Sequence, residues 1–251
     1  MIAELEKGRN MRHLVFLFAI GSIHILCACS QPAAPHEISD EEVIERFHKI
    51  FYGGPDTWHR SKWLGIETLQ NPNDVWITQE IIVEVVPDFI IETGTRHGGS
   101  ACLWAMILEE VNPAGKVITI DINPVPEPVT RLAIWKERVE FRQTSSTDPE
   151  LVAELTERMR GKKVLVILDS DHRENHVYQE LKAYGPMINK GSYIIVQDTN
   201  VNGHPVLPDY GAGPMEALHR FLGETNDFEV DSSRERFLFT MNPMGFLKRV
   251  T

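Results

Sequence analysis

Two short polar segments follow apolar runs whose composition is typical of buried strands. Asp169-Ser170-Asp171-His172 comes directly after residues 163–168, and Gln197-Asp198-Thr199-Asn200 comes directly after residues 192–196. The carboxyl ends of the strands form the ligand crevice of an open α/β sheet, so these side chains are expected to lie close together. Their carboxylate and amide oxygens suit Mg²⁺. Bound Mg²⁺ could lower the pKa of a substrate hydroxyl, and His172 could then remove its proton.

A purely structural role for these acids is the alternative. Asp169 and Asp198 could each cap the helix or loop that follows, as single aspartates often do. Because two acids follow two neighbouring strand ends, the sequence favours a metal site over two unrelated caps.

A glycine-rich turn, Glu92 to Ser100, lies between a predicted strand and a predicted helix. Glycines let the backbone approach a ligand closely, and a helix N-terminus offers free N–H groups. Asp121 ends the next predicted strand, where an acid can bind a ribose diol. The spacing of Gly94 and Gly98 does not fit the dinucleotide pattern G-x-G-x-x-G, and Glu92 suits an amino group better than a pyrophosphate. The turn therefore favours S-adenosylmethionine over a nicotinamide cofactor.

The residues expected to contact this cofactor lie in the turn and after the next strands, where an adenine edge could be read. They are Glu92, Gly94, Thr95, Arg96, Gly98, Gly99, Ser100, Asp121, Gln143, Ser145, Ser146 and Asp171.

Short apolar runs alternate with helical patterns along most of the chain. Strands are predicted at 89–91, 116–120, 139–141, 163–168 and 192–196, with helices at 100–111, 149–159, 175–184 and 215–222. The runs 228–230 and 237–240 are expected to close the sheet as a hairpin. The pattern predicts an α/β fold with a doubly wound, mostly parallel seven-stranded sheet over residues 89–251.

A helical extension is predicted to precede this core, over residues 39–88. Ser39 and Glu42 form a capping-box pattern at the start of a helix over 40–52, and a second helix covers 75–86. The segment 56–75 between them reads as irregular. Its Trp58 and Trp63, with Trp76, could wall a substrate, although helix packing explains them equally well.

The overall composition is that of an ordinary globular protein of 251 residues with a net charge of −11. An acidic chain without a long Lys and Arg run is a poor partner for nucleic acid. Of the other histidines, His97 is placed in the cofactor loop, whereas His176 and His219 are expected to be surface or packing residues. The acceptor is expected to be a small molecule or a glycolipid, and homo-oligomerisation is left open.

The N-terminal segment 1–29 reads as a signal or anchor. Its apolar run 14–25 is short for a membrane span, and Leu26-Cys27-Ala28-Cys29-Ser30 resembles a bacterial lipobox in which Cys29 would be lipidated. An uncleaved anchor or a buried helix is the alternative. Residues 30–38 form a proline-rich tether, so a membrane-associated protein is expected, on either side of the membrane.

Several ordered motifs together resemble the cephalosporin hydroxylase / rhamnosyl O-methyltransferase family, from about Trp58 to Val250. They are Ile91-Glu92-Thr93-Gly94 with Gly98-Gly99-Ser100, Ile120-Asp121, Leu168 to His172, Gly191 to Thr199, and Asn242-Pro243-Met244-Gly245. The resemblance implies the Rossmann-like class I methyltransferase fold, S-adenosylmethionine, Mg²⁺ and methylation of sugar or small-molecule hydroxyls.

The same resemblance, extended to catechol-type O-methyltransferases, implies a ligand set and a base. Asp169, Gln197 and Asp198 would hold Mg²⁺, and His172 would be the base. Gln197 stands where the family usually has an acid, which removes one charge from the site, and Asp171 is a nearby acid that could compensate.

The resulting hypothesis is methyl transfer from S-adenosylmethionine to a hydroxyl of a sugar, glycolipid or small natural product. One alternative is an exported lipoprotein that uses this fold to bind a ligand without turnover, because export would remove the domain from its cofactor supply. Another is an oxygenase, which would need two histidines and a carboxylate around an open metal position.

Overall fold

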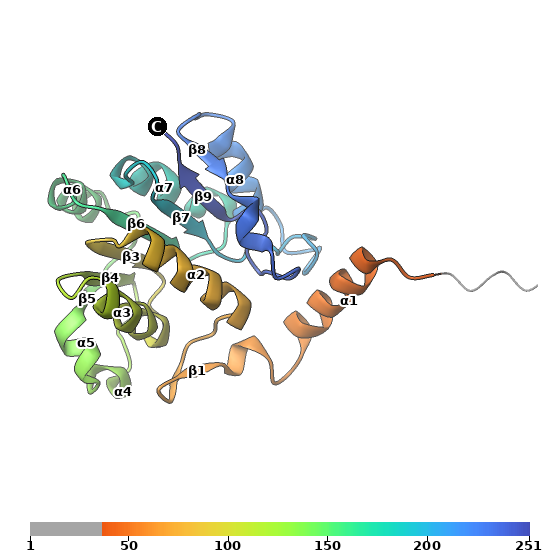
Figure 1. Cartoon of the computed structure of the whole chain (residues 1–251), viewed down its shortest axis with the longest axis horizontal. Coiled ribbons are helices and arrows are strands. Elements are labelled where there is room, and N and C mark those ends of the chain that lie inside the picture. Colours follow the sequence, from red (N-terminus) through yellow and green to blue (C-terminus); the bar gives the residue numbers. More distant parts are fainter. Residues whose placement is uncertain (1–36) are drawn as a thin grey trace, which may run out of the picture. The chain divides into compact units, whose positions relative to one another are not determined.

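The described residues, 37–251 of the computed structural model, contain a seven-stranded sheet in the order β5-β4-β3-β6-β7-β9-β8 (Figure 1). Its strands are β3 (Phe89–Thr93), β4 (Lys116–Asp121), β5 (Val139–Gln143), β6 (Val164–Leu168), β7 (Tyr193–Val196), β8 (Phe228–Val230) and β9 (Phe246–Arg249). β9 pairs antiparallel with both of its neighbours, and the other pairings are parallel. The predicted fold class is confirmed.

Helices cover both faces of this sheet, because alternate residues of each buried strand point to opposite sides. Ile90 packs in one apolar cluster with residues of α2, α3 and α5, whereas Ile91 packs in another with residues of α6, α7 and α8. The helices are α1 (Asp40–Gly53), α2 (Pro72–Val85), α3 (Gly99–Val111), α4 (Glu127–Thr130), α5 (Ala133–Arg138), α6 (Pro149–Arg158), α7 (Glu174–Tyr184) and α8 (Pro214–Leu222).

The segment expected to be irregular, 56–75, is more ordered than the sequence indicated. A short 3-10 helix (Trp58–Arg60) leads into a small antiparallel hairpin of β1 (Lys62–Trp63) and β2 (Ile66–Glu67). Asn71 then caps α2 by accepting from the Asn73 N–H at 3.3 Å, so α2 begins at Pro72 rather than at residue 75. Several residues of this segment line a cavity together with Asp169 and Asp198, which follow β6 and β7.

The predicted hairpin of 228–230 with 237–240 is wrong. β8 pairs instead with β9 (Phe246–Arg249), and two further 3-10 helices, Gly185–Met187 and Ser232–Glu235, lie in loops of this half of the molecule. The apolar run at 237–240 is used for packing: Phe239 makes edge contacts with Phe47 and Phe51 of α1. Leu238 has a φ of 65°, which no regular strand tolerates.

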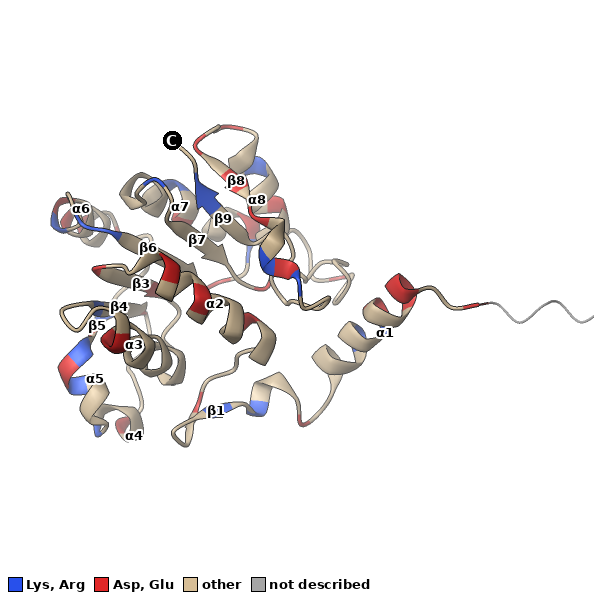
Figure 2. Ribbon diagram, in the orientation of Figure 1, with Lys and Arg blue, Asp and Glu red and all other residues tan. Residues whose placement is uncertain are grey.

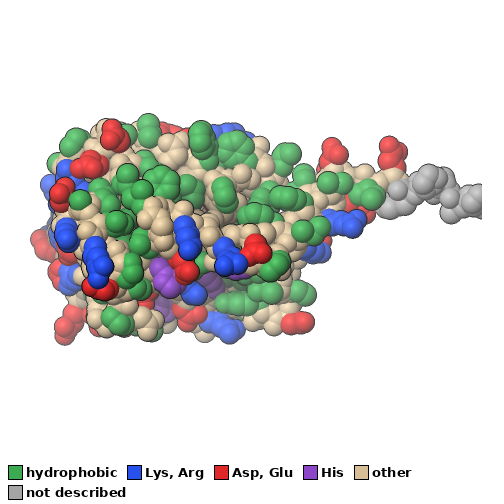
Figure 3. Space-filling model, turned by 90° about the horizontal axis from the view of Figure 1, so that it is seen from below, with side chains coloured by type: hydrophobic (Ala, Val, Ile, Leu, Met, Phe, Trp, Pro, Cys, Tyr) green, Lys and Arg blue, Asp and Glu red, His purple; other side chains and the backbone are tan. Residues whose placement is uncertain are grey.

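The helix α1 begins with the predicted capping box, in which Ser39 and Glu42 bond each other's backbone N–H. His48 anchors it, with its Nε2 atom 2.8 Å from Asn200 Nδ2. Its periodic residues Val43, Phe47 and Ile50 are 53%, 51% and 61% exposed. Hydrophobic side chains are accordingly visible along this helix in Figure 3.

Charges of both signs are interspersed over the helices and strands of the described residues (Figure 2). Within residues 37–251, no helix combines the length and the apolar character needed to cross a membrane. The predicted signal or anchor segment with Cys29, and residues 30–36 of the tether, lie outside the described residues.

Candidate active site

The turn between β3 and α3 brings two strand ends into direct contact. Gly94 has a φ of +90°, and a Cβ atom there would lie 1.9 Å from the carbonyl oxygen of Asp169. A Cβ on Gly99 would lie 2.4 Å from the carbonyl oxygen of Glu67 in β2. Both glycines therefore permit close backbone approach, one to β6 and the other to the N-terminal hairpin.

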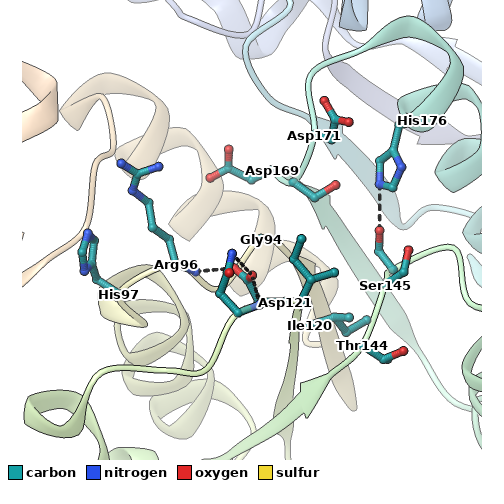
Figure 4. A pocket seen from close by; sticks show the side chains of 14 residues that line it. Gly94, Arg96, His97, Ile120, Asp121, Thr144, Ser145, Asp169, Asp171 and His176 are labelled. Atoms are coloured by element: carbon teal, nitrogen blue, oxygen red, sulfur yellow. Dashed lines mark hydrogen bonds between the residues drawn. The ribbon is translucent and has the colours of Figure 1, made fainter.

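A cavity of about 590 Å³ opens beside this turn, at the carboxyl ends of β3, β4, β5 and β6 (Figure 4). The predicted cofactor residues that line it are Gly94, Arg96, Asp121, Ser145, Ser146 and Asp171. The Asp121 carboxylate accepts from the Arg96 N–H at 2.8 Å and from the Asn123 N–H at 2.8 Å, which fixes its orientation in the cavity wall.

Glu92, Gln143, Gly98 and Gly99 are not among the residues that line this cavity or the smaller one described below. The Glu92 carboxylate is buried and accepts from Trp104 Nε1 at 3.0 Å and from Thr119 Oγ1 at 2.7 Å. Its burial raises its pKa to about 7. The exposed Gln143 donates to the carbonyl oxygen of Ile122 at 3.4 Å. A role of Glu92, Gln143, Gly98 and Gly99 in cofactor binding therefore stays a prediction.

His176 lines the larger cavity, although the sequence indicated a surface or packing role. Its Nε2 atom lies 3.0 Å from Ser146 Oγ and 3.5 Å from the fully buried carboxylate of Glu180. The bond to Glu180 raises the pKa of His176. The residue occupies the first turn of the helix that follows β6, and this placement was the signal that could have identified it.

A cluster of two carboxylates and one imidazole stands at the ends of β6 and β7. His172 Nε2 lies 3.4 Å from Asp169 Oδ1 and 3.4 Å from Asp198 Oδ2. Burial opposes the charge of His172, but the carboxylates of Asp198 and Asp169 raise its pKa to about 9. Burial raises the pKa of Asp198 to about 6, while the His172 charge opposes that rise.

This cluster fits a divalent cation. Ligand atoms of Asp169, His172 and Asp198 all lie within 4.8 Å of one another. The buried Nε2 of His172 has no hydrogen-bond partner within residues 37–251. The oxygen donors suit Mg²⁺. Among the residues described, the cluster contains a single histidine, so the two-histidine arrangement expected of an oxygenase is not formed there.

Gln197 lies beside the cluster and is tied to a residue that the sequence did not single out. Its Oε1 atom accepts from Gln70 Nε2 at 3.0 Å, and the same nitrogen donates to Asp169 Oδ2 at 3.0 Å. Because Gln70 comes from the segment expected to be irregular, nothing in the sequence indicated this contact.

A second cavity, of about 280 Å³, also reaches Asp169. The residues shared by both cavities are Gly94, Arg96, His97, Asp169 and Ser170. The predicted cofactor residues Thr95 and Ser100 line the smaller cavity, as do His172 and Asp198. His97 lies in the cofactor loop as expected, with its Nε2 3.1 Å from Glu67.

Two aromatic side chains of the N-terminal extension line this smaller cavity. The ring centroids of Tyr52 and Trp58 are 5.5 Å apart, and Trp58 Nε1 donates to the carbonyl oxygen of Tyr52 at 3.1 Å. Burial, with the nearby Asp198 charge, raises the pKa of Tyr52 to about 12. Of the three tryptophans considered from the sequence, Trp58 lines the cavity, whereas Trp63 donates to Met106 and Trp76 is 59% exposed.

The chain is similar to known proteins over most of its length. The family model described as Rhamnosyl O-methyltransferase/CmcI matches residues 55–250. The rhamnosyl O-methyltransferase of Mycobacterium tuberculosis is 40% identical over 215 residues, which cover 83% of this chain and 86% of that protein. The rhamnosyl O-methyltransferase of Mycobacterium leprae is 38% identical over 215 residues, or 83% of this chain and 91% of the relative.

Solved structures share the fold at lower identity. A structure of CmcI with Mg and SAM is 20% identical, with a TM-score of 0.57 over 77% of this chain and 78% of that chain. A CmcI structure with SAH is 19% identical, with a TM-score of 0.56 over 76% of this chain and 83% of that chain. From the family match and the 40% identity to a curated relative, the chain belongs to the rhamnosyl O-methyltransferase/CmcI family and is an S-adenosylmethionine-dependent methyltransferase.

Proposed function

We propose that the protein transfers the methyl group of S-adenosylmethionine to a hydroxyl of a sugar or glycolipid, with help from Mg²⁺. The observation that carries this proposal is the junction of two cavities at Asp169, where Asp169, His172 and Asp198 converge. Transfer needs the sulfonium methyl and the acceptor oxygen to meet in line, and a junction of this kind holds both reactants in one orientation.

The larger cavity is the cofactor side. Its volume of about 590 Å³ lies in the usual range for small-molecule sites. The fixed carboxylate of Asp121 can accept from the two ribose hydroxyls, and Ser145, Ser146 and His176 can read the edge of the base at the far end. The shared residues near Gly94 then leave the methyl group facing the smaller cavity.

The smaller cavity is the acceptor side. Its aromatic wall of Tyr52 and Trp58 offers an apolar face on which one sugar ring could stack, while the acidic cluster stands at the end where the hydroxyl would react. The relatives named rhamnosyl O-methyltransferases support a sugar as the acceptor. The apolar run 14–25 is consistent with an acceptor carried by a lipid, and we propose that it holds the protein at a membrane.

Asp169 and Asp198 would hold Mg²⁺, with Gln197 contributing a neutral oxygen. Bound Mg²⁺ supplies a charge that lowers the pKa of the acceptor hydroxyl. His172 accepts the hydroxyl proton at Nε2, the buried atom that lacks a hydrogen bond within residues 37–251. The two carboxylates favour its protonated form, so its ability to accept a proton depends on a cation that neutralises them.

A comparison of two tryptophan variants tests the acceptor side. Trp58→Ala is expected to raise KM for a rhamnoside acceptor by about tenfold or more, because the stacking face is lost, while the affinity for S-adenosylmethionine stays unchanged. Trp58→Phe should recover part of this loss. Trp76→Ala, which removes an exposed tryptophan of α2 that bonds Glu80, is the matched control. Equal kinetics for Trp58→Ala and Trp76→Ala would show that the sugar does not bind there.

A further inference from the structure

The side chain of Gln70 connects two of the expected metal ligands. Its amide nitrogen donates to Asp169 Oδ2 and to Gln197 Oε1, both at 3.0 Å, and the residue is 5% exposed. These partners are 99 and 127 residues away along the chain. Gln70 therefore joins the N-terminal extension to the ends of both β6 and β7.

The backbone around Gln70 is itself held in place. Its N–H donates to Ser61 Oγ at 3.0 Å, and the preceding Leu69 has a left-handed φ of 56°. The following Asn71 caps α2 and donates from Nδ2 to the buried carboxylate of Asp74 at 2.9 Å. The backbone from which the Gln70 side chain leaves is therefore held by contacts on both sides.

These bonds select which oxygens face the cluster. Asp169 needs a donor, so Gln70 must present its nitrogen, and the Gln197 side chain must then present its oxygen to that nitrogen. With Oδ2 of Asp169 occupied, its Oδ1 is the atom that lies 3.4 Å from His172 Nε2. Gln197 has a single side-chain oxygen, and the bond from Gln70 turns that oxygen, rather than the amide nitrogen, toward Gln70. An amide oxygen has a second lone pair, which can bind a cation while the first accepts from Gln70.

We propose that Gln70 is a positioning residue for the metal site, which orients Asp169 and Gln197 as oxygen donors without itself binding the cation. This inference rests on the proposed role of Mg²⁺. The bond from Gln70 would orient the side-chain oxygen of Gln197, a neutral residue at a position where the family usually has an acid. Ligands held by such outer contacts bind metal about 10–100-fold more tightly than ligands that lack them.

Titration of the full-length chain with Mn²⁺, followed by electron paramagnetic resonance of the free ion, tests the proposal. Gln70→Met keeps the length of the side chain and removes both donors, and it is expected to weaken Mn²⁺ binding about 10–100-fold. Gln179→Met, at an exposed position on α7, is the matched control and should bind as the unaltered chain does. Saturating Mg²⁺ should restore most of the turnover of Gln70→Met.

Folding of the variant is checked by its affinity for S-adenosylmethionine, since Gln70 does not line the larger cavity. Mn²⁺ binding by Gln70→Met that equals or exceeds that of the unaltered chain would overturn the proposal, and tighter binding would mean that the Gln70 amide competes with the cation. If the unaltered chain binds no Mn²⁺, both this inference and the proposed metal role fail together.

Discussion

Gly94 offers the sharpest test of how the turn after β3 sets the site. An alanine there would place Cβ 1.9 Å from the Asp169 carbonyl oxygen and 2.5 Å from its carbonyl carbon, at a φ of +90°. The left-handed conformation costs about 1–2 kcal/mol for a non-glycine residue. The overlap is with backbone, so β6 must move, at a further cost of about 1–3 kcal/mol. Gly94→Ala should therefore lower the free energy of unfolding by about 2–5 kcal/mol.

Gly161→Ala separates these two contributions. Gly161 also has a positive φ, +69°, but a Cβ atom there would meet nothing within 4 Å. The unfolded-state effect of a Gly-to-Ala change is common to both variants. Urea unfolding should therefore show Gly94→Ala to be less stable than Gly161→Ala by about 1–3 kcal/mol. Displacement of Asp169 should also lower kcat about 100-fold in Gly94→Ala alone. Equal stabilities and unchanged turnover would refute the close approach of Gly94 to the backbone of Asp169.

Three further predictions concern buried or cavity acids. Asp74→Ala removes a buried carboxylate that accepts from Thr240, Met241 and Asn71. Urea unfolding should show a free energy of unfolding lower by about 3–5 kcal/mol. The control Asp56→Ala, at an exposed position, should change it by less than about 0.5 kcal/mol. The pKa of Glu92 is raised from 4.5 to about 7, so its contribution to stability is complete below pH 4.5 and is lost as the pH rises through about 7. Between these pH values, the free energy of unfolding of the unaltered chain should fall by about 2–3 kcal/mol more than that of Glu92→Gln. Parallel curves of unfolding free energy against pH would contradict this. Asp121→Ala should weaken S-adenosylmethionine binding at least about 100-fold, as measured by calorimetry, and should leave the melting temperature unchanged. The control Asp209→Ala, at an exposed position, should leave the affinity unchanged. Unchanged affinity in Asp121→Ala would remove Asp121 from the site.

The core of the sheet and the acidic cluster could be predicted from the sequence for one physical reason. Buried parallel strands read as continuous apolar runs, and the residues that follow them must meet at one edge of the sheet. Asp169, His172 and Asp198 were found in this way, and the structure brings them within 4.8 Å. The turn at Gly94 was found because a strand, a glycine and a helix follow in order.

Other features depend on contacts that no local pattern reveals. The run Phe237 to Thr240 has the composition of a strand, yet Phe239 packs against aromatic residues of α1. The strand that pairs with β8 is β9 instead. Gln70 reaches partners more than 90 residues away. Glu92 was predicted to bind the cofactor because it opens the turn, and the sequence did not indicate that its carboxylate accepts from Trp104 and Thr119.

Methyl transfer itself is the most direct test of the proposed function. The full-length chain would be incubated with S-adenosylmethionine labelled with carbon-13 in its methyl group, Mg²⁺ and a panel of alkyl rhamnosides, and the products followed by NMR. The proposed function predicts a labelled methoxy group on the sugar, formed in stoichiometric amount with S-adenosylhomocysteine, and loss of the product when Mg²⁺ is chelated. Binding of S-adenosylmethionine without transfer to any hydroxyl in the panel, or transfer that is indifferent to chelation, would contradict it.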